Sequence, residues 1–439
     1  MTQTTRAPGT IDPGFGQRGF AFFPLPGSEG LNRTVTILPD KRVLVTLVYP
    51  PFDDVALGLA VFKEDGSLDP VFGSGGIKDI SFSQPLTFYP NTVLLLTSGG
   101  WLIAGTASTE KGLSLAVAKF QADGSLDPTY GAASTPGLTL IDVDDLVKGA
   151  TLLSSDQAPT DIMDNDGGNG AISATQQDGK IVIGSVVSVE GTPFPRGIVI
   201  QLDSTGNLDI TFNCKGYLLV NLPDGLDWTN VMAVRFQDDY LVVCGNYRKD
   251  LKLGGYFNRY DRLGNLDRSF GERNNGTVLI SLDDRLVRLS SFTVKSDNSL
   301  IGAGYVMDNQ IGGLVVHLTP KGSYNLLFNG GTPLVSKFLD SGVLWRTSMV
   351  QSDSNLIIAG QGGEDLGELR SSITARLLPN GDVDLKYADK GWVEYPSPDV
   401  GGNHTFRDAA LKSDDYMYVS ETQMEGGGTT RGSVFRYLV

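Results

Sequence analysis

A nine-residue motif recurs along the chain at an almost constant interval, and this recurrence limits the possible folds more than any other feature of the sequence. The clearest copy, residues 65–73, reads Asp-Gly-Ser-Leu-Asp-Pro-Val-Phe-Gly. Successive copies are separated by 57, 58, 82, 58, 58 and 59 residues, and they begin at Gly9, Gly66, Gly124, Gly206, Gly264, Gly322 and Gly381. Repeats of this length are structural units that bury their apolar faces against one another. We therefore expect residues 1–439 to form a single domain of seven units.

Each unit also carries a short polar turn between two apolar runs. Asp40 and Lys41, for example, separate residues 34–38 from residues 43–47. A third apolar run leads into the motif, as in residues 115–120, and a fourth follows it, as in residues 216–220. Four short strands per unit without a helical period predict an all-β fold, namely a seven-bladed β-propeller with four antiparallel strands per blade.

The order of the runs predicts how the ring closes. If the strand before the polar turn is the innermost, the chain opens with a single outer strand near residues 19–24 and ends with three strands between residues 406 and 439. We expect the N-terminal strand to complete the blade of the C-terminal three. Such a closure removes the free sheet edges that favour aggregation.

The motif, together with the upstream hairpin Gln-Asp-Gly-Lys-Ile-Val-Ile at residues 177–183, resembles the bacterial delta-60 repeat family. The resemblance covers nearly the whole chain and implies propeller-forming repeats and a bacterial origin. It supplies no catalytic residues, because the family is of largely unassigned function. The copy at Gly322 departs most from the pattern, with Tyr324 and Asn325 where other copies have Leu and Asp.

Charge and composition exclude several classes of partner. The formal net charge is -15 and the sequence pI is about 4.6, so we expect no nucleic-acid partner and no attraction to anionic membranes. The chain has no run of about 18 apolar residues and its N-terminus has no apolar signal region. We expect a monomer without membrane insertion, either cytoplasmic or exported without a Sec signal peptide.

The sequence offers little for metal or cofactor chemistry. It contains two histidines and two cysteines, which makes a Cys/His metal cluster close to impossible, and we expect no cofactor. The one break in the period adds an acidic insertion loop at residues 144–168, between the second and third blades. Its Asp161, Asp164 and Asp166 are weak candidates for a calcium site, because their spacing misses the EF-hand pattern. A solvated acidic loop is the default interpretation.

The recurring aspartates of the motif have a structural role in our interpretation. We expect each to cap its turn by accepting a backbone N–H two residues on. Five residues before each motif glycine stands a mostly polar or basic side chain, which we expect to bridge to groups of the turn: Lys119, Gln201, Arg259, His317, Arg376 and Arg436.

The starts of the inner strands are the strongest candidates for ligand binding. Counting seven residues back from each polar turn gives Arg33, Asn91, Ala171, Val231, Ser290, Arg346 and Arg407. Three arginines then fall on consecutive blades at one side of the channel mouth, beside loops that hold His404, Trp228 and Trp345. Either neighbouring carboxylates such as Asp340, Asp399 and Asp408 neutralise the arginines, or the arginines hold an anion.

Three functions compete. The leading hypothesis is a non-enzymatic recognition or scaffold propeller that binds a protein or carbohydrate partner through its variable-loop face, with Arg33, Asn91, Trp228, Trp345, Arg346, His404 and Arg407 as ligand-binding residues. The first alternative is an enzyme acting on a carboxylate or phosphate substrate at the channel mouth. The second alternative is a structural or surface-assembly component. Fold alone does not separate them.

Overall fold

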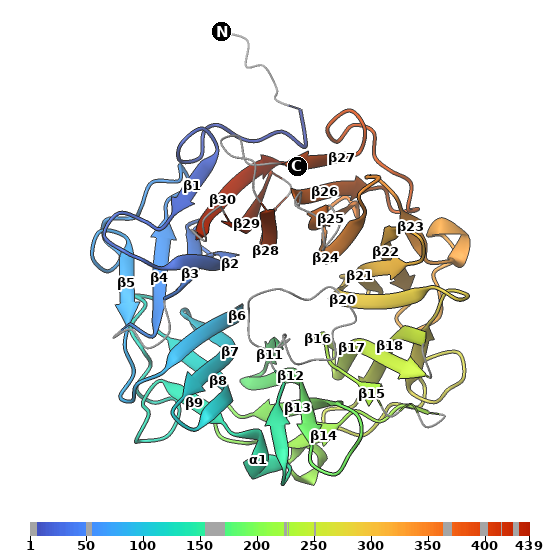
Figure 1. Cartoon of the computed structure of the whole chain (residues 1–439), viewed down its shortest axis with the longest axis horizontal. Helices are drawn as coiled ribbons and strands as arrows, with labels where there is room; N and C mark the ends of the chain where they lie inside the picture. Colours follow the sequence, from blue (N-terminus) through green and yellow to red (C-terminus); the bar gives the residue numbers. More distant parts are fainter. Residues whose placement is uncertain are drawn as a thin grey trace.

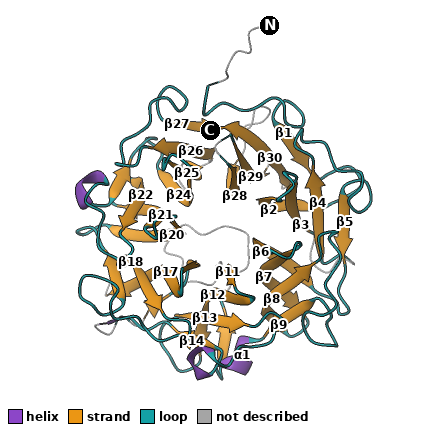
Figure 2. Cartoon of the chain, turned by 180° about the vertical axis from the view of Figure 1, so that it is seen from behind, coloured by secondary structure: helices purple, strands orange, loops and turns teal. Residues whose placement is uncertain are grey.

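Seven β-sheets surround a central axis in the computed structural model, as Figure 1 shows. The structure describes residues 7–49, 55–153, 172–223, 226, 228–249, 252–362, 371–395, 403–413, 415–424 and 430–439. Within these residues the sheets are antiparallel and follow one another around the ring in chain order, and helix is confined to single turns, as the colouring of Figure 2 makes plain. The prediction of an all-β, seven-bladed propeller with four strands per blade is confirmed.

The blades are numbered from the first complete one, and their strands run from the inside outwards. Blade 1 contains β2 (Leu31–Ile37), β3 (Val43–Val48), β4 (Leu57–Phe62) and β5 (Ile77–Ile80), and blade 2 contains β6 (Thr87–Leu95), β7 (Trp101–Thr109), β8 (Gly112–Phe120) and β9 (Leu138–Ile141). Blade 3 contains β10 (Ala150–Leu152), β11 (Ser173–Gln177), β12 (Lys180–Val189), β13 (Arg196–Leu202) and β14 (Tyr217–Leu219). Blade 4 contains β15 (Trp228–Thr229), β16 (Ala233–Gln237), β17 (Tyr240–Lys249), β18 (Lys252–Tyr260) and β19 (Thr277–Ile280).

The remaining blades repeat the arrangement. Blade 5 contains β20 (Leu286–Val294), β21 (Leu300–Met307), β22 (Ile311–Leu318) and β23 (Leu334–Ser336), and blade 6 contains β24 (Val343–Val350), β25 (Leu356–Gly362), β26 (Ser371–Leu377) and β27 (Trp392–Tyr395). Blade 7 contains β28 (Asn403–Lys412), β29 (Tyr416–Met424), β30 (Thr430–Leu438) and, as its outer strand, β1 (Phe20–Phe23). The apolar core lies mainly between neighbouring blades, where the facing side chains of two sheets pack together.

Blade 7 joins the two ends of the chain. β1 pairs antiparallel with β30, in a register that sets Phe20 opposite Phe435 and Phe23 opposite Gly432. Along β1, Phe20 and Phe23 are buried, whereas Phe22 is 39% exposed. The N-terminal strand therefore contributes both backbone pairing and core to the blade formed by the C-terminal strands.

The motif turns lie on one side of the ring, which we call the anchor side, and they are built alike. The side-chain oxygen of each Asp, or of Asn325 in blade 5, accepts the backbone N–H two residues on, at 2.9 to 3.3 Å. Six turns also donate a backbone N–H to a carbonyl of the next blade, at 2.7 or 2.8 Å: the donors are Gly16, Gly131, Asn213, Gly271, Asn329 and Ala388. These hydrogen bonds thus link the blades at six of the seven junctions, and the bond from Ala388 to Pro8 joins the two ends of the chain.

A polar side-chain pair ties each motif turn to its own blade. In blade 6, for example, Arg376 Nε donates to Asp384 Oδ2 at 2.8 Å, and in blade 7 Arg436 Nη2 lies 2.5 Å from Asp12 Oδ2. Where the usual cation is missing, the second strand supplies one instead: Arg42 in blade 1 and Lys180 in blade 3. Blade 5 pairs neutral groups, with Asn325 Nδ2 3.2 Å from His317 Nε2, and burial lowers the pKa of His317 to about 4.

The first part of the acidic insertion is regular structure, although the sequence predicted a loop for residues 144–168. Residues 143–146 form the single-turn helix α1 (Val143–Leu146), capped by the Asp142 side chain, and β10 pairs with β12. Val143 and Leu152 are buried in the apolar core between blades 2 and 3, so this part of the insertion packs against the ring. Asp161, Asp164 and Asp166 lie outside the described residues.

Candidate binding site on the inner strands

The inner strands share a break in their pairing with the second strand of the blade. In five blades the register shifts at the same place, and the skipped position is Arg33, Asn91, Ser290, Arg346 or Arg407. Blade 4 interrupts its inner strand instead, with Val231 between β15 and β16, and Ala171 of blade 3 lies outside the described residues. The positions selected from the sequence are therefore bulges, which redirect a side chain out of the regular pleat.

The second strand makes room for the bulge with a glycine. A Cβ atom at this place would lie 2.0 Å from a carbonyl oxygen of the inner strand, which is far inside contact distance, in four blades: Gly105, Gly245, Gly304 and Gly360. Blade 7 differs, because Glu421 stands at this place, opposite the residue that precedes the bulge. Blade 7 thus has a buried carboxylate where four blades have a glycine and blade 1 has the apolar side chain of Leu47.

Four consecutive inner strands each bring one arginine to the same part of the ring. Arg346, Arg407 and Arg33 occupy the bulges of β24, β28 and β2, which are neighbours around the axis, and Arg288 lies two residues before the bulge of β20 (Figure 1). Arg288 is buried and the other three are half-buried. We call these four residues the arginine cluster. It places one positive charge on each of four neighbouring inner strands in a chain of net charge -15.

One hydrogen bond and one neighbouring polar residue define the surroundings of the cluster. Arg407 Nε donates to Thr422 Oγ1 of the next strand at 2.7 Å. Asn91 occupies the bulge of β6 in blade 2, so the arc of bulge residues continues beyond Arg33 with a polar, uncharged side chain. The sequence prediction placed Arg33, Arg346 and Arg407 on consecutive blades, and the structure has them there.

Asp408 follows the bulge arginine of β28 and does not pair with it in the hydrogen bonds of the described residues. Its Oδ2 accepts the backbone N–H of Val35 in blade 1 at 3.0 Å, and its Oδ1 accepts that of Ala409 at 2.8 Å. Burial raises the pKa of Asp408 to about 7. The carboxyl group therefore gains or loses its negative charge near neutral pH, and it does so next to Arg407.

His404 was expected to contact a ligand, and the structure corrects this expectation. The side chain is only 2% exposed, and its Nδ1 lies 3.2 Å from Glu421 Oε1. Glu421 also accepts hydrogen bonds from Ser372 of blade 6 at 2.7 Å and from Ser433 at 3.1 Å. His404 therefore belongs to a buried network that links blades 6 and 7.

The two tryptophans are likewise packing residues. Trp345 is fully buried, its indole N–H donates to Ser336 Oγ at 3.0 Å, and its ring meets Phe338 edge-on. Trp228 is buried in β15. The expectation that both face a ligand is wrong, because large aromatic side chains near the ends of these strands fill the space between blades.

Sequence reasoning missed the network around Glu421. The available signal was the glycine of the second strand, which four blades share and which blade 7 replaces. Its serine partners gave no such signal, because Ser372 and Ser433 stand among other small residues of their strands. No group of three His, Cys, Asp or Glu side chains arranged for a metal occurs in the part of the chain that the structure describes.

Comparison with protein families supports the propeller. A model described as "Domain of unknown function (DUF5122) beta-propeller" matches residues 98–130 and 176–212. The matched segments lie in blades 2 and 3, and each spans a hairpin turn and a copy of the motif. The chain is thus similar to a family of propeller repeats. A search of curated proteins found no match.

Solved structures of similar shape have distant sequences. The chain aligns with the polysaccharide lyase Uly1 at 11% identity and a TM-score of 0.49, covering 93% of this chain and 90% of the other. It aligns with Drosophila Semaphorin 1b, extracellular domains 1-2, at 8% identity and 0.48, covering 96% and 86%. A PL25 ulvan lyase aligns at 10% identity and 0.47, covering 94% and 91%. Within the described residues, no helix has the length and apolar character to cross a membrane.

Proposed function

We propose that the protein is a recognition module that holds a partner bearing carboxylate groups, a protein or a glycan, at the arginine cluster. The observation that carries this proposal is the placement of one arginine on each of four consecutive inner strands, three of them at bulges. A guanidinium presents planar, permanently charged donors that match a carboxylate. Rigid strands hold the four groups in fixed relative positions, which limits the entropy lost on binding.

The construction of the anchor side supports this location. Its aspartates cap the turns and pair with cations of their own blade, and its backbone groups link the blades. Those polar groups therefore stabilise the closed ring through bonds within and between blades. The opposite ends of the blades carry connections of unequal length, and loops of this kind on a rigid scaffold commonly carry function.

A binding role fits the described side chains better than catalysis. General acid–base chemistry needs a titratable group within hydrogen-bond reach of a substrate. His404 and Glu421 are both buried and bonded to each other. Asp408, which follows Arg407, accepts backbone N–H groups of Val35 and Ala409 with its two carboxyl oxygens. Because these titratable groups are engaged within the fold, we prefer recognition to catalysis.

Removing two arginines tests the proposal. The double variant Arg346→Gln, Arg407→Gln should bind poly-L-glutamate and oligogalacturonate at least tenfold more weakly than the parent protein, because two charge-assisted contacts are lost. Isothermal titration at low ionic strength measures the affinity, and circular dichroism checks the fold. Arg262→Gln is the matched control, since Arg262 lies on the anchor side in ion pairs with Asp178 and Asp239. Equal affinities for the parent and the double variant would refute the proposal, and so would failure of both probes to bind the parent.

The affinity for these anions should also rise as the pH falls from 8 to 6. Asp408 has a pKa of about 7, so it loses its negative charge over this range and the cluster becomes more positive. We expect a gain of about fivefold, equivalent to roughly 1 kcal/mol for a unit charge about 8 Å away at an effective dielectric constant of about 40. Titrations at several pH values measure the effect, and Asp408→Asn should abolish it. An unchanged pH dependence in that variant would show that another group is responsible.

A further inference from the structure

Arg235 is a further arginine of the inner strands, outside the arginine cluster. It belongs to β16 of blade 4, which contacts β20 of blade 5, the strand that carries Arg288. The side chain is half-buried, and its Nη1 donates to Ser173 Oγ of β11 at 3.1 Å and to the carbonyl oxygen of Val234 at 2.7 Å. Two neutral oxygens of neighbouring inner strands therefore fix the orientation of the guanidinium.

Within the residues that the structure describes, no carboxylate lies at ion-pair distance from Arg235. Burial lowers the pKa of Arg235, and Cys244 and Asp408 are the titratable neighbours that oppose this effect. Cys244 is uncharged at neutral pH, because burial raises its pKa to about 12. Asp408 stands on β28, across the ring from β16 in Figure 1, so the guanidinium faces the interior of the ring.

The charge of Arg235 is therefore only partly compensated by the protein. A guanidinium keeps its proton in a folded protein, so the lowered pKa does not remove the charge. A charge that is partly withdrawn from water and lacks a carboxylate partner is unfavourable. An anion that enters the interior of the ring would supply the missing negative charge.

Two donors on one edge of the guanidinium are available to such an anion. The hydrogen bonds of the described residues engage Nη1 and leave Nε and Nη2 without a protein acceptor. Neither nitrogen is among the sealed atoms that lack a partner, so solvent reaches both. In Arg407, by contrast, Nε donates to Thr422 Oγ1 at 2.7 Å. Nε–H and Nη2–H are parallel and match the two oxygens of a carboxylate, and we call this pair of donors the Arg235 edge.

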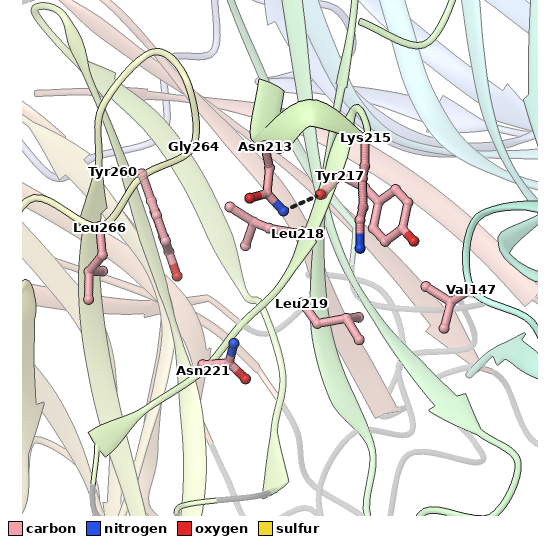
Figure 3. A pocket seen from close by; sticks show the side chains of 10 residues that line it. All are labelled: Val147, Asn213, Lys215, Tyr217, Leu218, Leu219, Asn221, Tyr260, Gly264 and Leu266. Carbon is pink, nitrogen blue, oxygen red and sulfur yellow. Dashed lines mark hydrogen bonds between the residues drawn. The ribbon is translucent and has the colours of Figure 1, made fainter. Parts of the chain in front are cut away.

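The hollows along the outer strands offer no comparable arrangement. Figure 3 shows one of them, about 430 Å³ in volume, in which Tyr217 and Tyr260 lie on opposite sides of β14. Its Asn213 side chain already donates to the carbonyl oxygen of Tyr217 at 2.9 Å. Lys215 is the one charged residue among those that line it, and an ammonium is a point charge without parallel donors. The Arg235 edge therefore has the more specific chemistry.

We propose that the Arg235 edge binds the carboxylate of a small organic acid in the interior of the ring. Nε and Nη2 each donate a hydrogen bond to one carboxylate oxygen, and the ligand supplies the negative charge. Because Ser173 and Val234 already hold the guanidinium, binding costs little side-chain entropy. The site does not depend on the arginine cluster, whose four residues lie on other blades.

Sodium acetate is the probe. The full chain carries Arg346→Gln and Arg407→Gln, so that acetate bound at the arginine cluster contributes less to the signal. At constant ionic strength, the Nε–H resonance of Arg235 should shift saturably with acetate and should not shift with acetamide, the neutral analogue. The resonance is assigned by its loss in Arg235→Lys, and ligand-observed NMR of acetate gives the affinity. A failure of the proposed anion binding at the arginine cluster would leave this result unchanged.

Two variants in the same background separate binding from a structural role. Arg235→Met removes the charge and all donors, so it should weaken acetate about tenfold or more. Its melting temperature should stay the same or rise, because the substitution leaves no carboxylate unpaired and Ser173 Oγ still accepts the backbone N–H of Val234. Arg235→Lys keeps the charge without the parallel donors and should weaken acetate about fivefold. Arg262→Gln is again the control and should leave the affinity unchanged.

Four results would overturn the proposal. The Nε–H resonance of Arg235 does not respond to acetate, or Arg235→Met or Arg235→Lys binds acetate as tightly as the background protein. A crystal structure grown in acetate shows only water at the Arg235 edge. Finally, trialanine with a free C-terminus binds more than about tenfold more tightly than acetate while its amide does not bind, which would assign the edge to the ends of peptide chains.

Discussion

Deletion of residues 1–26 should abolish the cooperative unfolding transition of the protein. The deletion removes β1 from β30 and with it the buried side chains of Phe15, Phe20 and Phe23. At roughly 2 to 3 kcal/mol for each fully buried phenylalanine, the loss is about 6 to 9 kcal/mol. A native domain is usually more stable than its unfolded state by only about 5–15 kcal/mol, so this loss is comparable with the whole stability. Differential scanning calorimetry of the truncated and full chains measures the effect.

A pair of point variants distinguishes this mechanism from a general effect of shortening the chain. Phe23 is buried and Phe22 is 39% exposed on the same short strand. Phe23→Ala should lower the free energy of unfolding by about 3 to 5 kcal/mol, and Phe22→Ala by less than about 1 kcal/mol. If the truncated chain unfolds at the temperature of the full chain, blade 7 does not depend on β1.

Replacement of Arg376 by leucine should cost about 3 to 5 kcal/mol, because it leaves the buried carboxylate of Asp384 without its cation. The same carboxylate must still cap its turn through the backbone N–H of Lys386 at 3.0 Å. Urea unfolding monitored by fluorescence gives the change in free energy. A loss below about 1 kcal/mol would mean that the pair contributes little.

Blade 5 suggests a double variant that should recover part of the lost stability. It replaces the ion pair with neutral His317 and Asn325, whose side chains lie 3.2 Å apart. The double variant Arg376→His, Asp384→Asn should therefore be more stable than Asp384→Asn alone, since neither member of the new pair is a buried unpaired charge. A double variant no more stable than that single one would show that the blade 5 solution depends on its local surroundings.

Most of the fold follows from local signals in the sequence. The motif aspartates cap their turns in every blade because an Asx turn requires only a side-chain oxygen two residues before the donor. Asn325 makes the same bond, so the divergent copy at Gly322 kept its turn. The pairing of Arg376 with Asp384 could be anticipated, because the two residues lie eight positions apart in the same blade.

The candidate site was only partly predictable. Spacing located Arg346 and Arg407 without revealing that they are bulges, because a bulge depends on how the inner strand pairs with the second strand of the blade. The burial of Trp345 and His404 depends on residues outside their own strands: Phe338 packs against Trp345, and Glu421 bonds His404. A pattern within one repeat does not encode those contacts.

Hydrogen–deuterium exchange with and without poly-L-glutamate tests the central claim most directly. The free edges of the inner strands carry backbone amides next to the arginine cluster, so binding there should slow exchange in β20, β24, β28 and β2 and leave the motif turns unchanged. Protection confined to the motif turns, such as residues 65–73 and 381–387, would contradict the account and place the binding surface on the anchor side.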